Sequence, residues 1–119
     1  MTFYKNDIFD PVKMMNETVA LGKEWANDKT AYELLKDTES SLKSEIFEKL
    51  KNEGHNTTSA EKLIAKDNKF IEHIRQKNIA LKKFLTSQVR YESKKKLDDL
   101  LQTDEVNKRH EMKMSGYQT

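Results

Sequence analysis

Residues 59–101, SAEKLIAKDNKFIEHIRQKNIALKKFLTSQVRYESKKKLDDLL, contain neither glycine nor proline and are dense in charged and aliphatic side chains. Scarce helix breakers together with many charged residues favour long helices over sheets. At about 100° per residue, one face of this stretch collects Ile64, Ile71, Ile74, Leu81, Leu85 and Val89. We therefore expect a long amphipathic helix over about residues 59–102, opened by a capping box at 58–61.

A first helical arm is expected over about residues 10–53. Asp10 can cap its free N–H groups, Pro11 suits the first helical position, and Gly54 is a stop signal. The stretch 27–30, Asn-Asp-Lys-Thr, is poor in helix formers and predicts a kink or break near Asn27. Residues 54–58 would be the loop between the two arms.

Thr103 and Asp104 could cap a short C-terminal helix over 103–115, although the second arm could equally pass straight through. The expected fold is all-α, a long antiparallel helical hairpin forming a single domain over 1–119. Only 35% of the 119 residues are hydrophobic. Such a thin supply of core residues predicts assembly of several chains into a helical bundle or ring.

The composition also limits the class of protein. There is no cysteine, so disulfides and thiolate metal sites are excluded. The N-terminal sequence MTFYKNDIFDP lacks the layout of a signal peptide, and no apolar run approaches the roughly 20 residues of a membrane span. We expect a cytoplasmic protein, within the host cell if a phage encodes it, that makes no contact with a membrane.

Positive charge is concentrated in one segment. Residues 62–96 carry 11 basic and 3 acidic side chains, 11 − 3 = +8, whereas residues 1–54 carry 8 basic and 11 acidic ones, 8 − 11 = −3. Opposite the apolar face, a basic stripe collects Lys62, Lys66, Lys69, His73, Lys83, Arg90 and Lys94. Beside it runs a seven-residue repeat of Phe70, Lys77, Phe84 and Tyr91.

Cations that neutralise phosphates, interleaved with aromatic rings that stack on bases, suit single-stranded nucleic acid. The predicted nucleic-acid-binding residues are Lys62, Lys66, Lys69, Lys77, Lys83, Phe84, Arg90, Tyr91, Lys94, Lys95 and Lys96. Two other interpretations stay open. The stripe could be a solvated face, or it could dock on the acidic first arm with the aromatics as packing between subunits.

The predicted oligomer or partner interface consists of Trp25, Ile71, Ile74, Leu81 and Leu85. Trp25, the single tryptophan, is interpreted first as a core or interface anchor and second as a base-stacking platform. The three histidines are isolated and stand in no metal-ligand spacing, and the sequence has no phosphate-binding loop. We therefore predict a protein that is not an enzyme and that has no catalytic residues, metal or cofactor.

Two stretches carry a family resemblance. Residues 15–54, MNETVALGKEWANDKTAYELLKDTESSLKSEIFEKLKNEG, resemble the N-terminal helical part of UvsY-type recombination mediators of T4-like phages. The shared layout is a Lys-containing approach to a single Trp at 22–25, a long amphipathic segment and a terminal Gly. The chain departs from that pattern at 46–49, Ile-Phe-Glu-Lys, where the mediators place a basic pair that contacts DNA.

Residues 59–113 resemble small helical phage proteins that accompany recombination genes, through Thr103, the run 107–109 (Asn-Lys-Arg) and the pair 111–112 (Glu-Met). The resemblance implies a non-catalytic homo-oligomer that binds single-stranded DNA. Such a protein loads a recombinase past the single-strand-binding protein. The alternatives are a protein-binding adaptor or inhibitor that acts through its helical faces, and a virion or assembly component.

Overall fold

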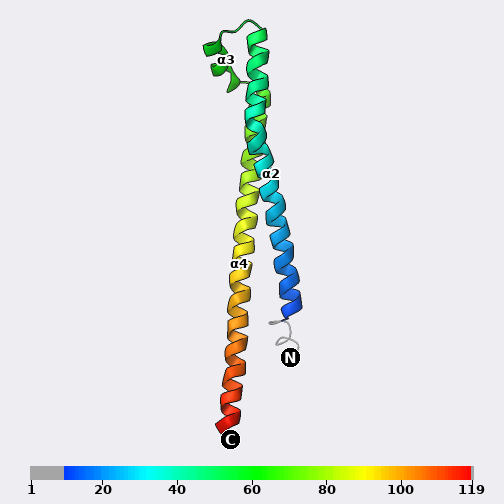
Figure 1. Cartoon of the computed structure of the whole chain (residues 1–119), viewed down its shortest axis with the longest axis vertical. Coiled ribbons are helices and arrows are strands. Elements are labelled where there is room, and N and C mark those ends of the chain that lie inside the picture. Colours follow the sequence, from blue (N-terminus) through cyan, green and yellow to red (C-terminus); the bar gives the residue numbers. More distant parts are fainter. Residues whose placement is uncertain (1–9, 119) are drawn as a thin grey trace. The chain divides into compact units, whose positions relative to one another are not determined.

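The computed structural model describes the backbone of residues 10–118 and the side chains of residues 10–113. It contains α2 (Pro11–Asn52), α3 (Thr57–Ile64) and α4 (Asn68–Gln118), and no strand over the described backbone. The long helices α2 and α4 run antiparallel and pack on each other, with α3 inserted after the turn between them (Figure 1). The expected all-α helical hairpin is confirmed.

The ends of α2 lie close to where the sequence predicts them. Asp10 Oδ1 accepts hydrogen bonds of 3.1 Å from the backbone N–H groups of Val12 and Lys13, which have no partner inside the helix. At the other end Gly54 has φ +99°, a conformation in which a side chain would be strained. The N–H of His55 then reaches back to the carbonyl of Leu50 at 3.1 Å, which closes the helix.

Of the kink or break expected near Asn27, the break is wrong, because α2 continues through residues 27–30. The Thr30 hydroxyl donates to the carbonyl of Ala26 at 2.9 Å, so this weak helix former turns its polar group onto its own helix. A weak local propensity over four residues therefore does not interrupt a helix that is supported on both sides.

The second arm is interrupted where the sequence predicts one continuous helix. The chain leaves α3 at Ile64, passes through residues 65–67 and enters α4 at Asn68. Asp67 Oδ1 accepts from the N–H groups of Lys69 at 2.8 Å and Phe70 at 3.3 Å. Asn56, and not Thr58, caps α3, since its Oδ1 accepts from the N–H of Ser59 at 2.8 Å. Both caps are short polar residues of the favoured type.

No separate C-terminal helix begins at Thr103 within the described part of the chain. α4 runs through this position, and the Thr103 hydroxyl donates to the carbonyl of Asp99 at 2.9 Å, as Thr30 does on α2. The ion pair between Lys108 and Asp104, 3.2 Å apart and separated by one helical turn, supports the continuing helix.

The described helices divide into two compact units, each containing part of α2 and part of α4. One comprises Met1–Glu24 and Ser87–Thr119, and the other comprises Trp25–Thr86. In each unit a line of side chains that are not fully exposed faces the opposite helix, and we call this line the seam. On α2 it recurs at intervals of three and four: Met14, Thr18 and Leu21 in the first unit, then Tyr32, Leu35, Glu39, Leu42 and Ile46 in the second.

The seam is thin and partly polar. Among the described residues, the buried hydrophobic side chains are Met14, Ile46 and Ala60, while Ser87 and Asp98 are buried and polar. A heptad spacing ordinarily brings apolar side chains together, so polar groups at these positions lower stability unless they are paired. The stability of the seam therefore depends on how its polar groups are paired.

Replacing Asp67 tests whether the α3–α4 junction depends on its cap. Asp67→Ala removes the acceptor for two N–H groups of α4 and should lower the free energy of unfolding by about 1 kcal/mol, measured by urea denaturation. Asp37→Ala, at an exposed position inside α2, is the matched control and should change stability by less than about half as much. Equal effects of the two substitutions would contradict the capping role.

Candidate nucleic-acid interface

The predicted line of aromatic and basic residues lies in the seam and not on an open face. Phe84 stacks on Tyr32 of α2, with ring centroids 5.9 Å apart and planes inclined by 20°. Phe70 lies beneath the Lys43 ammonium, which is 5.5 Å from the ring centroid. Both rings are half-buried, so the seam occupies the faces that a nucleic-acid base would need.

Tyr91 lies against α2 at Gly22. A Cβ at this glycine would be only 3.1 Å from Tyr91 Cε1, so the absence of a side chain allows the ring to approach the helix closely. The Lys95 ammonium covers the same ring at 5.8 Å from its centroid. Gly22, which is part of the stretch that resembles the UvsY-type mediators, therefore provides the space in which the Tyr91 ring packs.

Three of the predicted cations are neutralised by carboxylates of α2. Lys77 Nζ lies 2.7 Å from Glu39 Oε1, Arg90 Nη1 lies 3.2 Å from Glu24 Oε1, and Lys94 Nζ lies 3.7 Å from Glu17 Oε2. The interpretation in which the stripe docks on the acidic first arm therefore describes these three residues, with the docking inside the chain. Lys77, Phe84, Tyr91 and Lys94 lie against α2 and are not open to nucleic acid as predicted, whereas Arg90 stays exposed beside Glu24.

The physical reason is that the seam of α4 is partly polar. The helical wheel selected the face with the most apolar residues, whereas the side of α4 that meets α2 includes Lys77 and Asp98, which pair with Glu39 and Thr18. The repeat 70, 77, 84, 91 has the heptad spacing of helices that stay in contact, and it marks this side of α4. The seven-residue spacing is the sequence signal that could have identified the seam.

The expected apolar face of α4 is turned outward only in part. Ile71 is 51% exposed and Leu85 is 48% exposed. The other predicted interface residues, Trp25, Ile74 and Leu81, are half-buried in their unit. The Lys29 ammonium lies 6.0 Å from the ring centroid of Trp25, a cation–π contact between neighbouring turns of α2.

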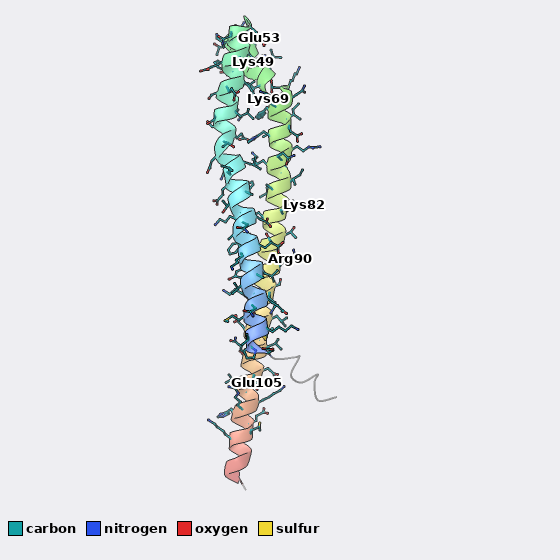
Figure 2. All side chains as sticks on the ribbon, turned by 90° about the vertical axis from the view of Figure 1, so that its right-hand side faces the viewer. Lys49, Glu53, Lys69, Lys82, Arg90 and Glu105 are labelled. Carbon is teal, nitrogen blue, oxygen red and sulfur yellow. The ribbon has the colours of Figure 1, made fainter. Side chains whose placement is uncertain are left out.

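The remaining predicted cations are exposed. Lys62 ends α3, Lys66 lies in the connection to α4, and Lys69 lies in the first turn of α4, where Figure 2 shows it near Lys49 and Glu53. Among the described side chains, none of these three makes an ion pair. Lys83, Lys95 and Lys96 are also exposed on α4.

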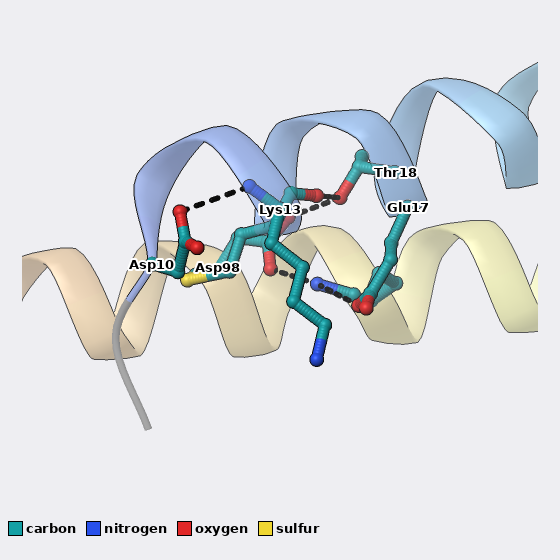
Figure 3. A network of polar contacts seen from close by, with 7 residues as sticks. Asp10, Lys13, Glu17, Thr18 and Asp98 are labelled. Carbon is teal, nitrogen blue, oxygen red and sulfur yellow. Dashed lines mark hydrogen bonds and ion pairs between the residues drawn. The ribbon is translucent and has the colours of Figure 1, made fainter. Parts of the chain in front are cut away.

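A buried polar cluster joins the helices in the unit that contains Ser87–Thr119. Asp98, 8% exposed, accepts hydrogen bonds from the Thr18 hydroxyl and the Lys94 ammonium, and Lys94 also approaches Glu17 (Figure 3). Burial raises the pKa of Asp98, but the hydrogen bonds from Lys94 and Thr18 outweigh it and hold this pKa below its ordinary value. Asp98 is therefore ionised at neutral pH.

A second polar layer occurs in the seam of the other unit. The hydrogen bond from Lys77 lowers the pKa of Glu39 below its ordinary value, against the opposing effect of burial. His73, predicted to lie in the basic stripe, instead places Nε2 2.7 Å from the carbonyl oxygen of Leu35. Because a carbonyl can only accept, this nitrogen carries a proton and donates it.

The described residues offer little to a small ligand. A groove of about 210 Å³ beside Asp98 is lined by Asp10, Lys13, Met14, Glu17, Lys94, Leu97 and Leu101. That volume is below the roughly 300 Å³ at which ligand pockets begin. A larger hollow of about 400 Å³ is lined by residues of α4 alone, so no second element encloses a ligand there: Asp99, Gln102, Thr103, Val106 and Asn107. Over the described part of the chain, no three His, Asp or Glu side chains are grouped to hold a metal ion, and no helix is long and apolar enough to cross a membrane.

Comparison with protein-family models, with curated proteins and with solved structures gives no significant match to this chain.

Asp98→Asn should lower the free energy of unfolding at pH 7 by about 1–2 kcal/mol, because Lys94 keeps its charge in the seam and loses the nearer of its two carboxylate partners. Urea denaturation followed by circular dichroism measures the change. Asp99→Asn, next to it but exposed, is the control and should have little effect. A variant at position 98 as stable as the native chain would show that the cluster contributes nothing.

The same cluster predicts the pH dependence of stability. A carboxyl group whose pKa is lowered in the folded state contributes stability above its unfolded pKa, about 3.9 for Asp. That contribution is lost as pH falls through the lower, folded pKa. Native protein should therefore lose stability as pH falls below about 4, and Asp98→Asn should show a shallower loss over the same range.

Proposed function

We propose that the chain is a non-catalytic accessory protein that binds single-stranded DNA through phosphate contacts. The resemblance to UvsY-type mediators extends the proposal to a role in phage-type recombination, in which the protein helps to load a recombinase past the single-strand-binding protein. A cytoplasmic location, the host cytoplasm for a phage protein, goes with this role.

The proposal rests on a set of exposed lysines that form no ion pair with any side chain of residues 10–113. Lys62, Lys66 and Lys69 fall within eight residues at the junction of α3 and α4, and Lys96 lies on α4 in the other unit. Exposed ammonium groups on a helical surface release counterions when they meet phosphates, which favours binding whatever the base sequence.

Phosphate contact without base stacking is the mode that fits these side chains. The aromatic rings of Phe84 and Tyr91 face the seam, so they are not part of the proposed surface. We therefore expect weak binding per chain, strong dependence on salt and no preference among base sequences. Several chains on one strand would supply the affinity that a single surface lacks.

A salt titration of oligonucleotide binding tests the proposal. Lys62→Gln, Lys66→Gln and Lys69→Gln combined should weaken binding and reduce the slope of log affinity against log salt by about 2, since each single-strand phosphate contact adds about 0.7. Fluorescence anisotropy with labelled oligothymidylate measures both quantities.

The matched control combines Lys23→Gln, Lys36→Gln and Lys49→Gln, which removes the same charge from exposed positions of α2. It should change the slope much less. No binding by the native chain at low salt, or affinity that does not depend on salt, would overturn the proposal. An equal effect of the two triple variants would remove the assignment to the α3–α4 junction.

A protein-binding adaptor is the second candidate, favoured by apolar side chains exposed on α2. Val12, Met15 and Val19, spaced by three and four residues, are 63%, 60% and 49% exposed. Such a stripe suits a groove on another protein. Partner capture that Met15→Ser abolishes, together with no DNA binding by the native chain, would favour this candidate over the first.

A further inference from the structure

The outer face of α2 in the unit Trp25–Thr86 is acidic. Glu33, Asp37, Ser41, Ser44 and Glu48 follow one another at intervals of four, four, three and four residues, so they share one side of the helix. Glu45 and Leu34 lie beside them, and Leu34 is 63% exposed. All seven side chains are exposed, which makes this an open acidic face with one apolar side chain in it.

The outer face of α4 in the same unit has the opposite character. Ile71, Arg75, Ile79, Lys82 and Leu85 recur at intervals of three and four and are all exposed. Ile71, Ile79 and Leu85 are each about half exposed, at 51%, 48% and 48%. Lys82 projects from this part of α4 (Figure 2). Arg75 Nε lies 3.3 Å from Glu72 Oε2 and forms an ion pair with it. Both side chains are more than half exposed to solvent, so the pair is weak.

We propose that these two faces bind each other between copies of the chain, with the acidic face of α2 from one copy seated on the basic, apolar face of α4 from the next. Carboxylates of residues 33–48 then meet Arg75 and Lys82. Leu34 enters the apolar surface formed by Ile71, Ile79 and Leu85. The partner is a second copy of the chain, because each chain carries both complementary surfaces.

Charge determines the geometry of this contact. Two acidic faces repel each other, as do two basic faces, so a symmetric contact of like faces is disfavoured. Each copy instead offers one face of each kind, and the two faces lie on different helices and point away from the seam between them. They therefore meet different neighbours, which makes the contact head-to-tail. Such a contact extends until the rotation between copies closes a ring, and otherwise gives an open assembly. The inference needs no DNA and stands apart from the proposed function.

The test is a charge swap followed by sedimentation velocity at low salt and about 100 μM protein, a concentration that detects weak association. The native chain should sediment as species heavier than its 14.0 kDa monomer, and added salt should dissociate them. Asp37→Lys with Glu48→Lys should give monomers, and so should Arg75→Glu with Lys82→Glu. An equimolar mixture of these two variants should associate again, because the reversed α2 of one matches the reversed α4 of the other.

Glu53→Lys with Glu61→Lys reverses two exposed charges outside both faces and should leave assembly unchanged. Leu34→Ala should weaken association by about tenfold without changing its salt dependence, since it removes apolar contact alone. Circular dichroism verifies that each variant keeps its helices.

A monomeric native chain at low salt would overturn the inference. Assembly that ignores salt would do so as well, and so would two reversed variants that stay monomeric when mixed. Assembly that both reversals leave intact would place the contact on another surface. DNA binding is measured separately by anisotropy, so a failure here is distinguishable from a failure of the proposed function.

Discussion

The pairing of charges inside the seam is the constraint on which the rest of the structure depends. Two long helices with few apolar residues can stay together only if the polar groups between them satisfy one another. Two polar clusters meet this condition, one in each unit. Lys77 pairs with Glu39 in one, and Asp98 accepts from both Lys94 and Thr18 in the other. Apolar residues at the same positions would pack in several registers, whereas these pairs are satisfied in one.

This use of charge reduces the surface available for function. Arg90 and Lys94 contribute to the high positive charge of 62–96, yet their carboxylate partners lie within the same chain. What is left for a partner is the set of exposed lysines and the apolar residues that point away from the seam. A count of charges along the sequence therefore overstates the field that a phosphate would meet.

The two proposals use different parts of this remaining surface. Lys62, Lys66 and Lys69 surround the α3–α4 junction, while Arg75 and Lys82 belong to the outer face of α4. A chain that self-associates through α2 and α4 keeps the junction open to solvent. Many junctions in one assembly would raise the effective concentration of weak phosphate contacts, which is how a protein with no deep site can hold a flexible strand.

The sequence by itself determined the helical class, the start of α2 at Asp10–Pro11 and its end near Gly54, because capping and breaker chemistry act over a few neighbouring residues. It carried the caps at Asn56 and Asp67 as well, but a continuous apolar pattern hid the interruption at 65–67. Only the tertiary structure decided which side of α4 meets α2. Polar residues such as Lys77 are stable at this contact because a carboxylate of a helix many residues away meets them, and a wheel drawn for one helix does not contain that partner. For that reason Lys77 and Phe84 are seam residues, and Ile71 and Leu85 remain exposed.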